Sequence, residues 1–405
     1  MLIKFNFENF KSFKNENCLD MEATSLKEHE YNLINLNNNK YLKIAAIYGA
    51  NASGKTNVLE AFEYMKNNLI LSNGVRSNNF YGDNYSFSFN SKTKNEPIGL
   101  EVVIVAENKE IYKYGYKIKE NMIISEWLYI KTVNKFTSIF EREGTKISFS
   151  KSYDVKIKEH NVDDSTLFLS LYNKLDIKND DFSNVILWFR KANFLDLGNP
   201  NFEYNRFNTA LPFIIDTDFK EYKKGLLSFM RVADLGITDF IFKEKKNSND
   251  EKYLEKFTVH KNEEGEDVIL SLSSESKGTF KMFHLYTYII MALKYGFVLF
   301  IDELDAKLHP LLTRYIINLF HDSSKNIGNG QLIYSTHDTV NLNKDTFRRD
   351  EIWFAEKDKS GVSELYSLSE YKIDNAKIRN DATYNKDYLT GRYGAIPVFE
   401  EFKII

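Results

Sequence analysis

Residues 44–56 read Ile-Ala-Ala-Ile-Tyr-Gly-Ala-Asn-Ala-Ser-Gly-Lys-Thr, an apolar run that leads straight into a glycine loop ending in Lys55 and Thr56. The apolar residues predict a buried strand over 41–48, and the helical period of the following residues predicts a helix over 56–71. A strand, a glycine loop and a helix in this order are the setting that a phosphate-binding loop requires. The stretch therefore predicts an α/β fold that binds ATP and Mg²⁺.

The chemistry of this loop gives its polar groups distinct roles. Glycines let backbone N–H groups turn inward around a phosphate, and the helix adds the positive end of its dipole. Lys55 would reach the β- and γ-phosphates, and the Thr56 hydroxyl would be a ligand of Mg²⁺. The residues expected to contact the nucleotide here are Gly49, Asn51, Ser53, Gly54, Lys55, Thr56 and Asn57.

Two later strands end in polar residues that suit ATP hydrolysis. Residues 297–303, Phe-Val-Leu-Phe-Ile-Asp-Glu, predict a strand covered on both faces that ends in two acids. Asp302 would hold Mg²⁺ through its water shell, and Glu303 would orient or deprotonate the attacking water. In ABC-type ATPases a histidine after the next strand senses the γ-phosphate, and Leu332-Ile-Tyr-Ser-Thr-His337 resembles that arrangement. The predicted catalytic residues are Lys55, Glu303 and His337.

A turn rich in serine precedes the acidic strand. Leu272-Ser-Ser-Glu-Ser276-Lys-Gly278-Thr279 resembles the signature of ABC-type ATPases, although it departs from the common Ser-Gly-Gly-Gln form. The resemblance implies that Ser276 and Gly278 contact the nucleotide of a second copy of the chain. A simple helix cap by Ser276 or Thr279 is the alternative. Asp305 matches the D-loop of the same interface, so we expect a homodimer or higher homo-oligomer with composite nucleotide sites.

The bulk properties exclude several classes of protein. The 405 residues are 43% hydrophobic and 27% charged, the balance of a soluble globular protein with one large or two ordinary domains. A net charge of −3 gives no global positive field that would recruit nucleic acid. No apolar run reaches the roughly 18 residues of a membrane helix, and the N-terminus lacks the apolar core of a signal peptide. The single cysteine, Cys18, excludes an internal disulfide, so we expect a cytoplasmic protein.

The order of the predicted elements divides the chain into three parts. Residues 1–150 would be the N-terminal half of an ATPase core, with the phosphate loop and an antiparallel β lobe over 98–149. Residues 151–267 would be a helical insert or lid, with helices over 182–190 and 219–235 and a charged loop or exposed hairpin over 243–267. Residues 268–405 would complete the core. The predicted fold class is α/β, an ABC-type P-loop head with an antiparallel β lobe, a parallel β core and a mostly helical insert.

With these motifs the chain resembles ABC-type ATPases of the SMC and RecF kind and, more narrowly, the OLD-like bacterial ATPases of AAA family fifteen. Besides the phosphate loop, the resemblance rests on Phe7-Glu-Asn9-Phe-Lys11-Ser-Phe13, Glu275-Ser-Lys-Gly-Thr279 and Tyr388-Leu-Thr-Gly-Arg-Tyr-Gly-Ala-Ile-Pro397. It implies that Asn9, Lys11 and Ser12 lie near the nucleotide. It also implies a place in anti-phage, abortive-infection operons, as for AriA-like ATPases of PARIS systems and AbiL- and RloA-like ATPases. Those act with a separately encoded effector, often a TOPRIM-like nuclease.

Two departures from the pattern narrow the expected activity. The only glutamine is Gln331, so the residue in the Q-loop role of ABC-type ATPases is not identified. The segment after the histidine motif is short for a nuclease domain, so we expect nuclease chemistry in a partner. The leading hypothesis is a sensor and regulatory ATPase of a defence operon that controls an effector and responds to a phage component. The alternatives are a RecF-like DNA repair ATPase that clamps DNA and a scaffold that only binds ATP. The Gly391–Gly394 turn is either a structural bend or a partner contact.

Overall fold

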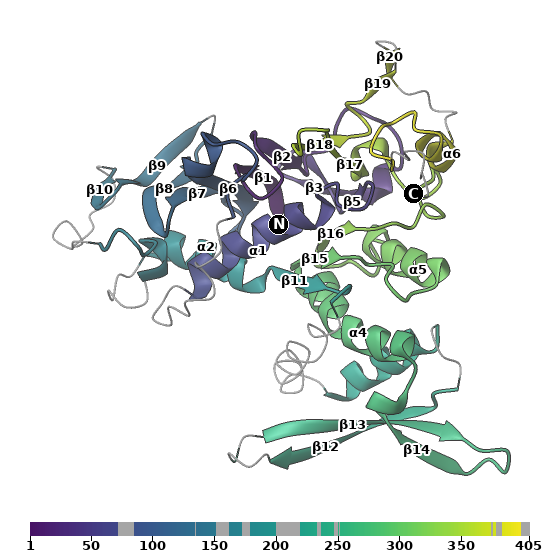
Figure 1. Cartoon of the computed structure of the whole chain (residues 1–405). Coiled ribbons are helices and arrows are strands. Elements are labelled where there is room, and N and C mark those ends of the chain that lie inside the picture. Colours follow the sequence, from purple (N-terminus) through teal and green to yellow (C-terminus); the bar gives the residue numbers. More distant parts are fainter. Residues whose placement is uncertain are drawn as a thin grey trace, which may run out of the picture.

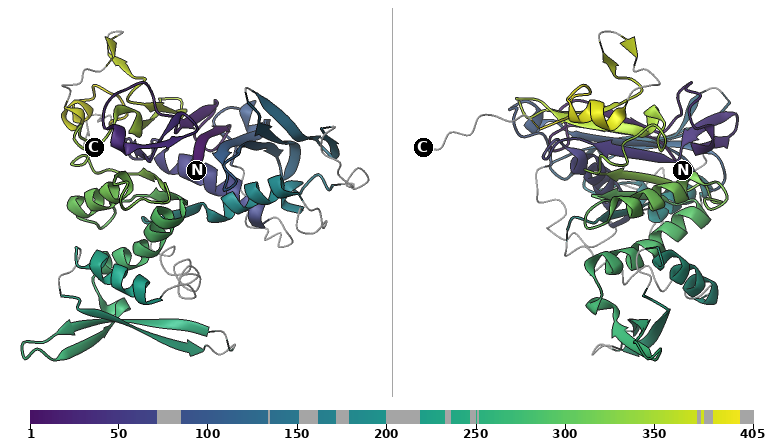
Figure 2. Two further views of the ribbon diagram at one scale, coloured as in Figure 1. Left: turned by 180° about the vertical axis from the view of Figure 1, so that it is seen from behind. Right: turned by 90° about the vertical axis from the view of Figure 1, so that its right-hand side faces the viewer.

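Two large β-sheets lie on either side of helix α1 (Lys55–Leu71) (Figure 1). The computed structural model describes residues 1–71, 85–133, 135–150, 162–171, 179–199, 219–232, 236–246, 250, 252–373, 376–377 and 383–397. A third, three-stranded sheet lies beyond helix α4 (Lys277–Tyr295), at the end of the molecule away from the other two (Figure 2).

The first sheet has seven antiparallel strands in the order β10-β9-β8-β7-β6-β1-β2. Its strands are β1 Leu2–Glu8, β2 Asn17–Asp20, β6 Ile98–Val105, β7 Ile111–Lys119, β8 Met122–Lys131, β9 Phe136–Glu143 and β10 Lys146–Phe149. In β7, Tyr112, Tyr114 and Tyr116 are buried at every second position, the pattern of a sheet with one covered face. The predicted antiparallel β lobe is confirmed.

The second sheet has six strands in the order β11-β15-β16-β5-β17-β18, all parallel except the edge strand β18. Its strands are β11 Asn193–Asp196, β15 Val298–Asp302, β16 Gln331–Ser335, β5 Ile44–Tyr48, β17 Ile352–Lys357 and β18 Ser363–Ser367. Every residue of β5, β15 and β16 is buried, because helices cover both faces of the sheet. The predicted parallel core and the α/β class are confirmed.

The two faces of this core sheet belong to two hydrophobic cores. Ala45 and Phe300 face α1, where Phe62 stacks on Phe300 with 3.9 Å between the ring centroids. Ile44 and Ile301 belong to the opposite core, which is formed with α4 and α5 (Pro310–His321). Neighbouring residues of one strand therefore enter different cores, as the pleat of a strand requires.

The strand predicted over 41–48 is divided in the structure. It consists of β4 (Asn39–Leu42), which pairs with β3 (Leu33–Leu36) as a hairpin, and of β5. Lys43 marks the break, because its buried ammonium donates to the carbonyls of Tyr31 (2.8 Å) and His321 (2.7 Å). A buried charge needs such acceptors. His321 is distant in sequence, so the local apolar pattern did not reveal this contact.

The first part of the insert belongs to the β lobe. Helix α2 (Asp180–Lys191) packs Phe182 against Phe140 and Phe189 against Tyr114, with 5.9 Å between the ring centroids in each pair. β11 then joins the core sheet beside β15. The predicted boundary at residue 150 therefore needs correction, because the amphipathic α2 buries its apolar face against the lobe.

The described residues of the rest of the insert form a helix over 219–230 and the third sheet, so this described part is not mostly helical. β12 (Asp239–Lys246) and β13 (Lys252–Lys261) form an antiparallel hairpin, and β14 (Asp267–Ser271) pairs with β13. Of the two alternatives for 243–267, the hairpin is observed. The predicted helices appear as α2 and 219–230; residues 233–235 lie outside the described part of the chain.

The remaining elements are short: η1 Glu30–Asn32, η2 Thr93–Asn95, η3 Leu169–Leu171, η4 Leu272–Ser274, η5 Arg349–Glu351, β19 Lys372–Ile373, β20 Ala376–Lys377 and α6 Tyr384–Leu389. The turn after α6 is anchored within the chain, since Tyr393 is buried and donates from its hydroxyl to Asp387 (3.0 Å); a contact of this turn with a partner stays a prediction. Across the described residues, every helix is too short or too polar to cross a lipid bilayer.

Candidate functional site

The phosphate loop lies between the carboxyl end of β5 and α1, at the sheet edge where α/β folds bind ligands. Gly49 and Gly54 are both in very close contact with neighbouring strands. A Cβ on Gly49 would collide with the Ala355 carbonyl of β17, and a Cβ on Gly54 (φ 113°) would lie 2.8 Å from Ser363 Oγ of β18. Neither position has room for a side chain, so β17 and β18 set the narrow curve of the loop.

Lys55 and Ser53 place polar groups inside this loop. Lys55 is buried, and its Nζ donates to the carbonyls of Gly49 (3.0 Å) and Ala50 (2.9 Å). Burial lowers the pKa of Lys55, while three nearby acids act in the opposite direction. Ser53 Oγ is buried and makes no hydrogen bond within the described residues. An ammonium and an unsatisfied buried hydroxyl in one loop fit an anionic ligand such as the phosphates of ATP.

Thr56 and Asp302 are far apart in sequence and meet at one point. The Thr56 hydroxyl lies near the carboxylate of Asp302, the last residue of β15, and its interaction with that carboxylate lowers the pKa of Asp302. Ser335, the last residue of β16, also donates from its hydroxyl to Asp302 Oδ1. Burial raises the pKa of Asp302, the hydroxyls of Ser335 and Thr56 lower it, and the charges of Asp196 and Glu303 raise it. A hydroxyl beside a carboxylate supplies the oxygen ligands that Mg²⁺ prefers, so the two residues fit the predicted metal site.

Glu303 follows Asp302 with an unusual backbone conformation. Its φ of 52° lies in the left-handed region, which is strained for a residue other than glycine. Its backbone N–H donates to Ser335 Oγ (2.8 Å), so one serine contacts both acids. The carboxylate lies against Gly198, where an added Cβ would be 2.5 Å from Glu303 Oε2. The turn takes the Glu303 side chain out of the fully buried strand. A group that orients an attacking water has to be accessible to that water, so this position suits the predicted role.

Asp305 and His337 are joined within one chain. Asp305 Oδ1 accepts from the Thr336 hydroxyl (2.7 Å) and from the backbone N–H of His337 (3.2 Å). Desolvation and the charge of Lys55 lower the pKa of His337, while Asp305 and Glu303 act to raise it. These interactions bring the exposed His337 close to the phosphate loop and the acidic pair. The role of His337 as a sensor of the γ-phosphate stays a prediction.

The signature turn begins α4 beside the segment that follows Glu303. Ser276 caps the helix, because its Oγ accepts from the backbone N–H of Thr279 (3.1 Å). An added Cβ on Gly278 would stand at an ordinary contact distance, 3.5 Å, from the Lys307 carbonyl. The helix cap, which was the alternative for Ser276, is thus observed. Contact of Ser276 and Gly278 with the nucleotide of a second copy stays a prediction.

The N-terminal turn reaches the loop through Ser12. Ser12 Oγ accepts from Asn57 Nδ2 (2.7 Å) in the first turn of α1 and lies within hydrogen-bonding distance of Ser363 Oγ (2.8 Å). Asn57 therefore supports the turn that braces the loop. Asn51 is exposed in the loop. Direct contacts of Asn51 and Asn57 with the nucleotide stay predictions.

The side chains of Asn9 and Lys11 have partners within the chain. Asn9 is buried, and its Nδ2 donates to the carbonyls of Thr93 (2.8 Å) and Glu96 (2.9 Å). The Asn9 amide thus holds this neighbouring segment, and a contact of Asn9 with the nucleotide stays a prediction. Lys11 forms an ion pair with Glu60 of α1, and its contact with the nucleotide stays a prediction.

Three further side chains touch the site without being predicted from the sequence. Ser335 holds the acidic pair, the Ser363 hydroxyl donates to the Ser53 carbonyl (2.7 Å), and the Tyr388 hydroxyl lies near the backbone of Gly49. Ser335 and Tyr388 stand in motifs quoted above, but nothing local in those motifs indicates their contacts. The lone glutamine, Gln331, is buried and its Oε1 accepts from the backbone of Leu2 (2.6 Å), so it is structural.

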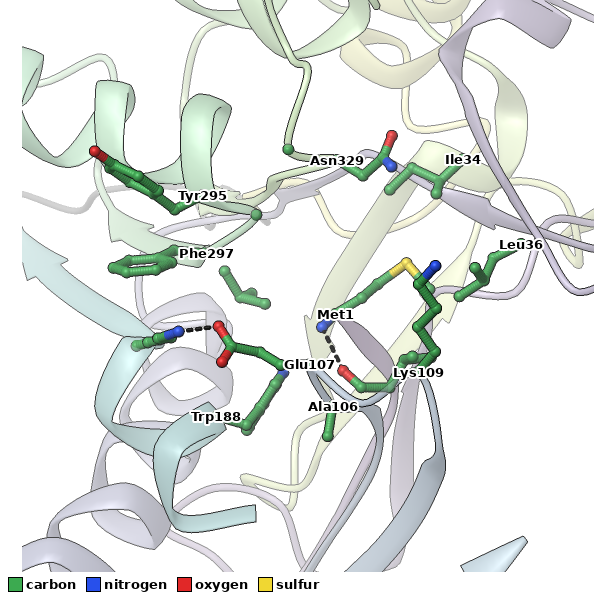
Figure 3. A pocket seen from close by; sticks show the side chains of 15 residues that line it. Met1, Ile34, Leu36, Ala106, Glu107, Lys109, Trp188, Tyr295, Phe297 and Asn329 are labelled. Atoms are coloured by element: carbon green, nitrogen blue, oxygen red, sulfur yellow. Dashed lines mark hydrogen bonds and ion pairs between the residues drawn. The ribbon is translucent and has the colours of Figure 1, made fainter. Parts of the chain in front are cut away.

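A pocket of about 190 Å³ at the opposite edge of the core sheet is separate from this site (Figure 3). It lies at the amino end of β15, where Tyr295 and Phe297 stand across from Met1 and Glu107. Asp302 lies at the other end of the same strand, next to the phosphate loop. The pocket and the candidate nucleotide site therefore lie at opposite ends of β15.

The chain matches a family model described as "AAA domain, putative AbiEii toxin, Type IV TA system" over residues 44–343. No curated protein sequence matches it. Among solved structures it is similar to the SMC head domain from Thermotoga maritima, with 13% identity, 92% of this chain and 99% of that chain covered, and a TM-score of 0.44. It is also similar to an Smc head domain from Pyrococcus furiosus, with 11% identity, 90% of this chain and 96% of that chain covered, and a TM-score of 0.49. A third similar structure is the recombination mediator protein RecF, with 13% identity, 90% of this chain and 98% of that chain covered, and a TM-score of 0.38. At such low identity the likeness concerns the fold. The match to the family model contains the phosphate loop, the acidic strand and His337, so the chain belongs to this family of AAA domains and is a P-loop ATPase.

Proposed function

We propose that the chain acts as a nucleotide-linked homodimer that hydrolyses ATP with Mg²⁺ and regulates a separately encoded effector in a bacterial anti-phage system. The observation that carries the enzymatic part is the convergence of Thr56 and Asp302, which brings the phosphate loop next to the acidic strand. The description of the family as a toxin of a toxin–antitoxin system supports the defence part. We further propose that the chain is an OLD-like ATPase and that its effector is a TOPRIM-like nuclease. A phage component would be the trigger.

The side chains of one copy suit phosphoryl transfer. Lys55 would balance the charge of the β- and γ-phosphates. Thr56 and Asp302 would hold Mg²⁺, which neutralises phosphate charge when bound. Glu303 would orient the attacking water and accept its proton. The lowered pKa of His337 favours the neutral imidazole, which can still donate one hydrogen bond to a γ-phosphate oxygen.

The features of the signature turn support a second copy at each site. Ser276 and Gly278 open α4, a helix of 19 residues whose first N–H groups and dipole suit a phosphate. Gly278 has ordinary space around it inside the chain, so its missing side chain leaves room for a group from outside. Two copies related by a two-fold axis would each present this turn to the phosphate loop of the other.

Complementation between two inactive variants tests the composite site. Lys55→Ala removes the ammonium, whereas Ser276→Asp adds a negative charge beside the phosphate but keeps a residue that caps helices well. Each variant alone should lose ATPase activity. Because a heterodimer retains one intact site, an equal mixture should regain about a quarter of the wild-type rate. Ser276→Asn, which caps without the charge, is the matched control. Failure of the mixture to recover, with both variants folded by circular dichroism, would refute the composite site.

A DNA clamp is the alternative role, and the charges of the insert do not favour it. Lys245 and Lys246 on β12 form ion pairs with Glu255 (2.8 Å) and Asp250 (2.7 Å), so acids compensate this basic run. ATPase activity that rises with duplex DNA, together with binding that weakens steeply with salt, would favour the clamp. Co-purification with the product of the adjacent gene, and loss of toxicity control in Lys55→Ala, would favour the regulator.

A further inference from the structure

The three-stranded sheet has one protected edge and one unprotected edge. β12 forms the first edge and carries Lys243, Lys245 and Lys246, the kind of charges that prevent sheets from pairing with each other. β14 forms the other edge with the sequence Asp-Val-Ile-Leu-Ser over 267–271, and all five residues are exposed. Figures 1 and 2 show this sheet at a free end of the molecule. The contrast between the two edges indicates that β14 pairs with a further strand.

Three consecutive large apolar side chains make the β14 edge unusual. Val268, Ile269 and Leu270 are 37%, 51% and 39% exposed. Exposed apolar runs of this kind signal a functional surface in a soluble protein. Successive side chains of a strand point to opposite faces of the sheet, so one helix laid on one face cannot cover all three. A further strand beside β14 contacts the side chains of both faces.

The backbone of β14 offers hydrogen bonds on its open side. Within β13, the carbonyl of Val259 accepts from the N–H of Thr238, on the β12 side (2.8 Å). Backbone groups alternate in direction along a strand, so the residues on either side of Val259 face β14, where they are paired with Val268 and Leu270. The N–H and C=O of Ile269 therefore point outward, toward a strand that would extend the sheet.

The sequence of β14 suits an antiparallel copy of itself. About a two-fold axis at Ile269, this residue faces its own counterpart, Val268 faces Leu270, and Asp267 faces Ser271. The register opposes no like charges, which destabilise cross-strand pairs. The charge of Asp267 is already paired with Lys261 (2.7 Å) inside each sheet. A second copy of the chain therefore buries the apolar side chains, hydrogen-bonds the open backbone groups and brings no like charges opposite each other.

We propose that two copies of the chain pair their β14 strands antiparallel about Ile269, so that their three-stranded sheets become one continuous sheet. This contact is distinct from the nucleotide-linked dimer and does not require ATP. It is linked to the ATPase site through Glu275 of the signature turn, whose carboxylate accepts from His260 (2.8 Å) and from the Thr258 hydroxyl on β13. Pairing of the sheets thus fixes the two signature turns relative to each other.

Cysteine cross-linking without nucleotide tests the register. On a Cys18→Ser background no other thiol is present. Ile269→Cys should give a disulfide-linked dimer under mild oxidation, because directly opposed residues have Cα atoms about 5.5 Å apart, within disulfide range. Asp267→Cys alone should not cross-link, whereas the double variant Asp267→Cys/Ser271→Cys should. Lys243→Cys, on the protected edge, is the exposed control and should stay monomeric on a denaturing gel.

Sedimentation without nucleotide tests the dimer itself. Wild-type chain should be dimeric, and Ile269→Lys should raise the dimer dissociation constant about 100-fold or more, because two lysines meet at the axis. Ile269→Thr should retain most of the dimer. Since Ile269 is half exposed within one copy, the substitution should leave the circular dichroism spectrum of the folded chain unchanged. A monomeric wild type, or a dimer that Ile269→Lys leaves intact and Ile269→Cys does not cross-link, overturns the proposal. The same measurements on Lys55→Ala keep the result independent of the composite ATP site.

Discussion

Removal of the Ser335 hydroxyl tests whether one serine positions both acids of the site. In Ser335→Ala, Asp302 loses a hydrogen bond and the N–H of Glu303 loses its acceptor. A hydrogen bond to a charged group contributes about 1.5–3 kcal/mol, and an unsatisfied buried N–H costs about 1–3 kcal/mol. We therefore expect the free energy of unfolding to fall by about 2–4 kcal/mol. If the bond to Asp302 also acts in the transition state, kcat should fall about 10- to 100-fold.

The same substitution should shift the pH dependence of the ATPase. Burial raises the pKa of Asp302, and the hydrogen bond from Ser335 lowers it. Without that bond the pKa rises further, by about one unit for each 1.4 kcal/mol lost. The ionised carboxylate is the form that can hold a cation, so activity is present above the pKa and is lost as the pH falls through it. The acid limb of the activity profile should therefore move to higher pH in Ser335→Ala.

Phosphate release against pH, ATP binding without Mg²⁺ and thermal unfolding separate catalysis from stability. Ser335→Thr keeps the hydroxyl and should restore the pH profile. Ser170→Ala is the matched control, because Ser170 is a buried serine of the β lobe whose Oγ donates to the Leu167 carbonyl (2.7 Å). It should lose stability but no activity. A Ser335→Ala protein with wild-type kcat and an unshifted acid limb would refute the positioning role, whatever its melting temperature.

Three further predictions concern the β lobe. Glu126→Ala should lower the free energy of unfolding by about 3–5 kcal/mol, since it leaves the fully buried Arg142 without its carboxylate partner; denaturant titration measures this, and a loss below 1 kcal/mol would contradict it. Asn9→Ala should lower the melting temperature and leave ATP affinity unchanged, because the Asn9 amide holds residues 93–97. A weaker ATP affinity in a folded variant would contradict this and support a contact of Asn9 with the nucleotide. Burial raises the pKa of Cys18 to about 12, so at a pH of about 8 only about one thiol in 10⁴ is ionised. Iodoacetamide should therefore label native Cys18 far more slowly than the unfolded chain, and equal rates by mass spectrometry would count against this burial.

The elements around the phosphate loop could be predicted because their signals are local. β5, β15 and β16 are apolar runs, each followed at once by a glycine or a polar residue, and a fully buried parallel strand needs no partner in view to be recognised. The break at Lys43 could not be predicted, because the acceptors of its ammonium include a carbonyl of α5. The position of α2 was missed for a similar reason, since the aromatic rings that receive it belong to β7 and β9.

In the candidate site, the sequence predicted the types of the residues but not the contacts between them. The motifs identified Thr56, Asp302 and Glu303 by type, and Thr56 indeed meets Asp302. The contact of Ser335 with both acids follows from β15 and β16 being neighbours in the sheet, an order that spacing along the chain does not state. Asn9 shows the opposite case. It was implied by resemblance, yet its left-handed backbone (φ 51°) and its buried amide make it part of the lobe.

The two roles considered for Ser276 are compatible, because a hydroxyl has one donor and two acceptor positions. Its Oγ accepts from the N–H of Thr279 (3.1 Å) and shares a second hydrogen bond with Thr279 Oγ1 (2.8 Å), in which either oxygen can donate. When Thr279 donates, both acceptor positions of Ser276 are filled and its own hydrogen stays free for a phosphate oxygen. The cap then orients the donor before any nucleotide arrives, since the oxygen is held by its own helix. Within the proposed dimer, the serine that starts α4 in one copy can therefore act on the phosphate bound by the other without giving up the cap.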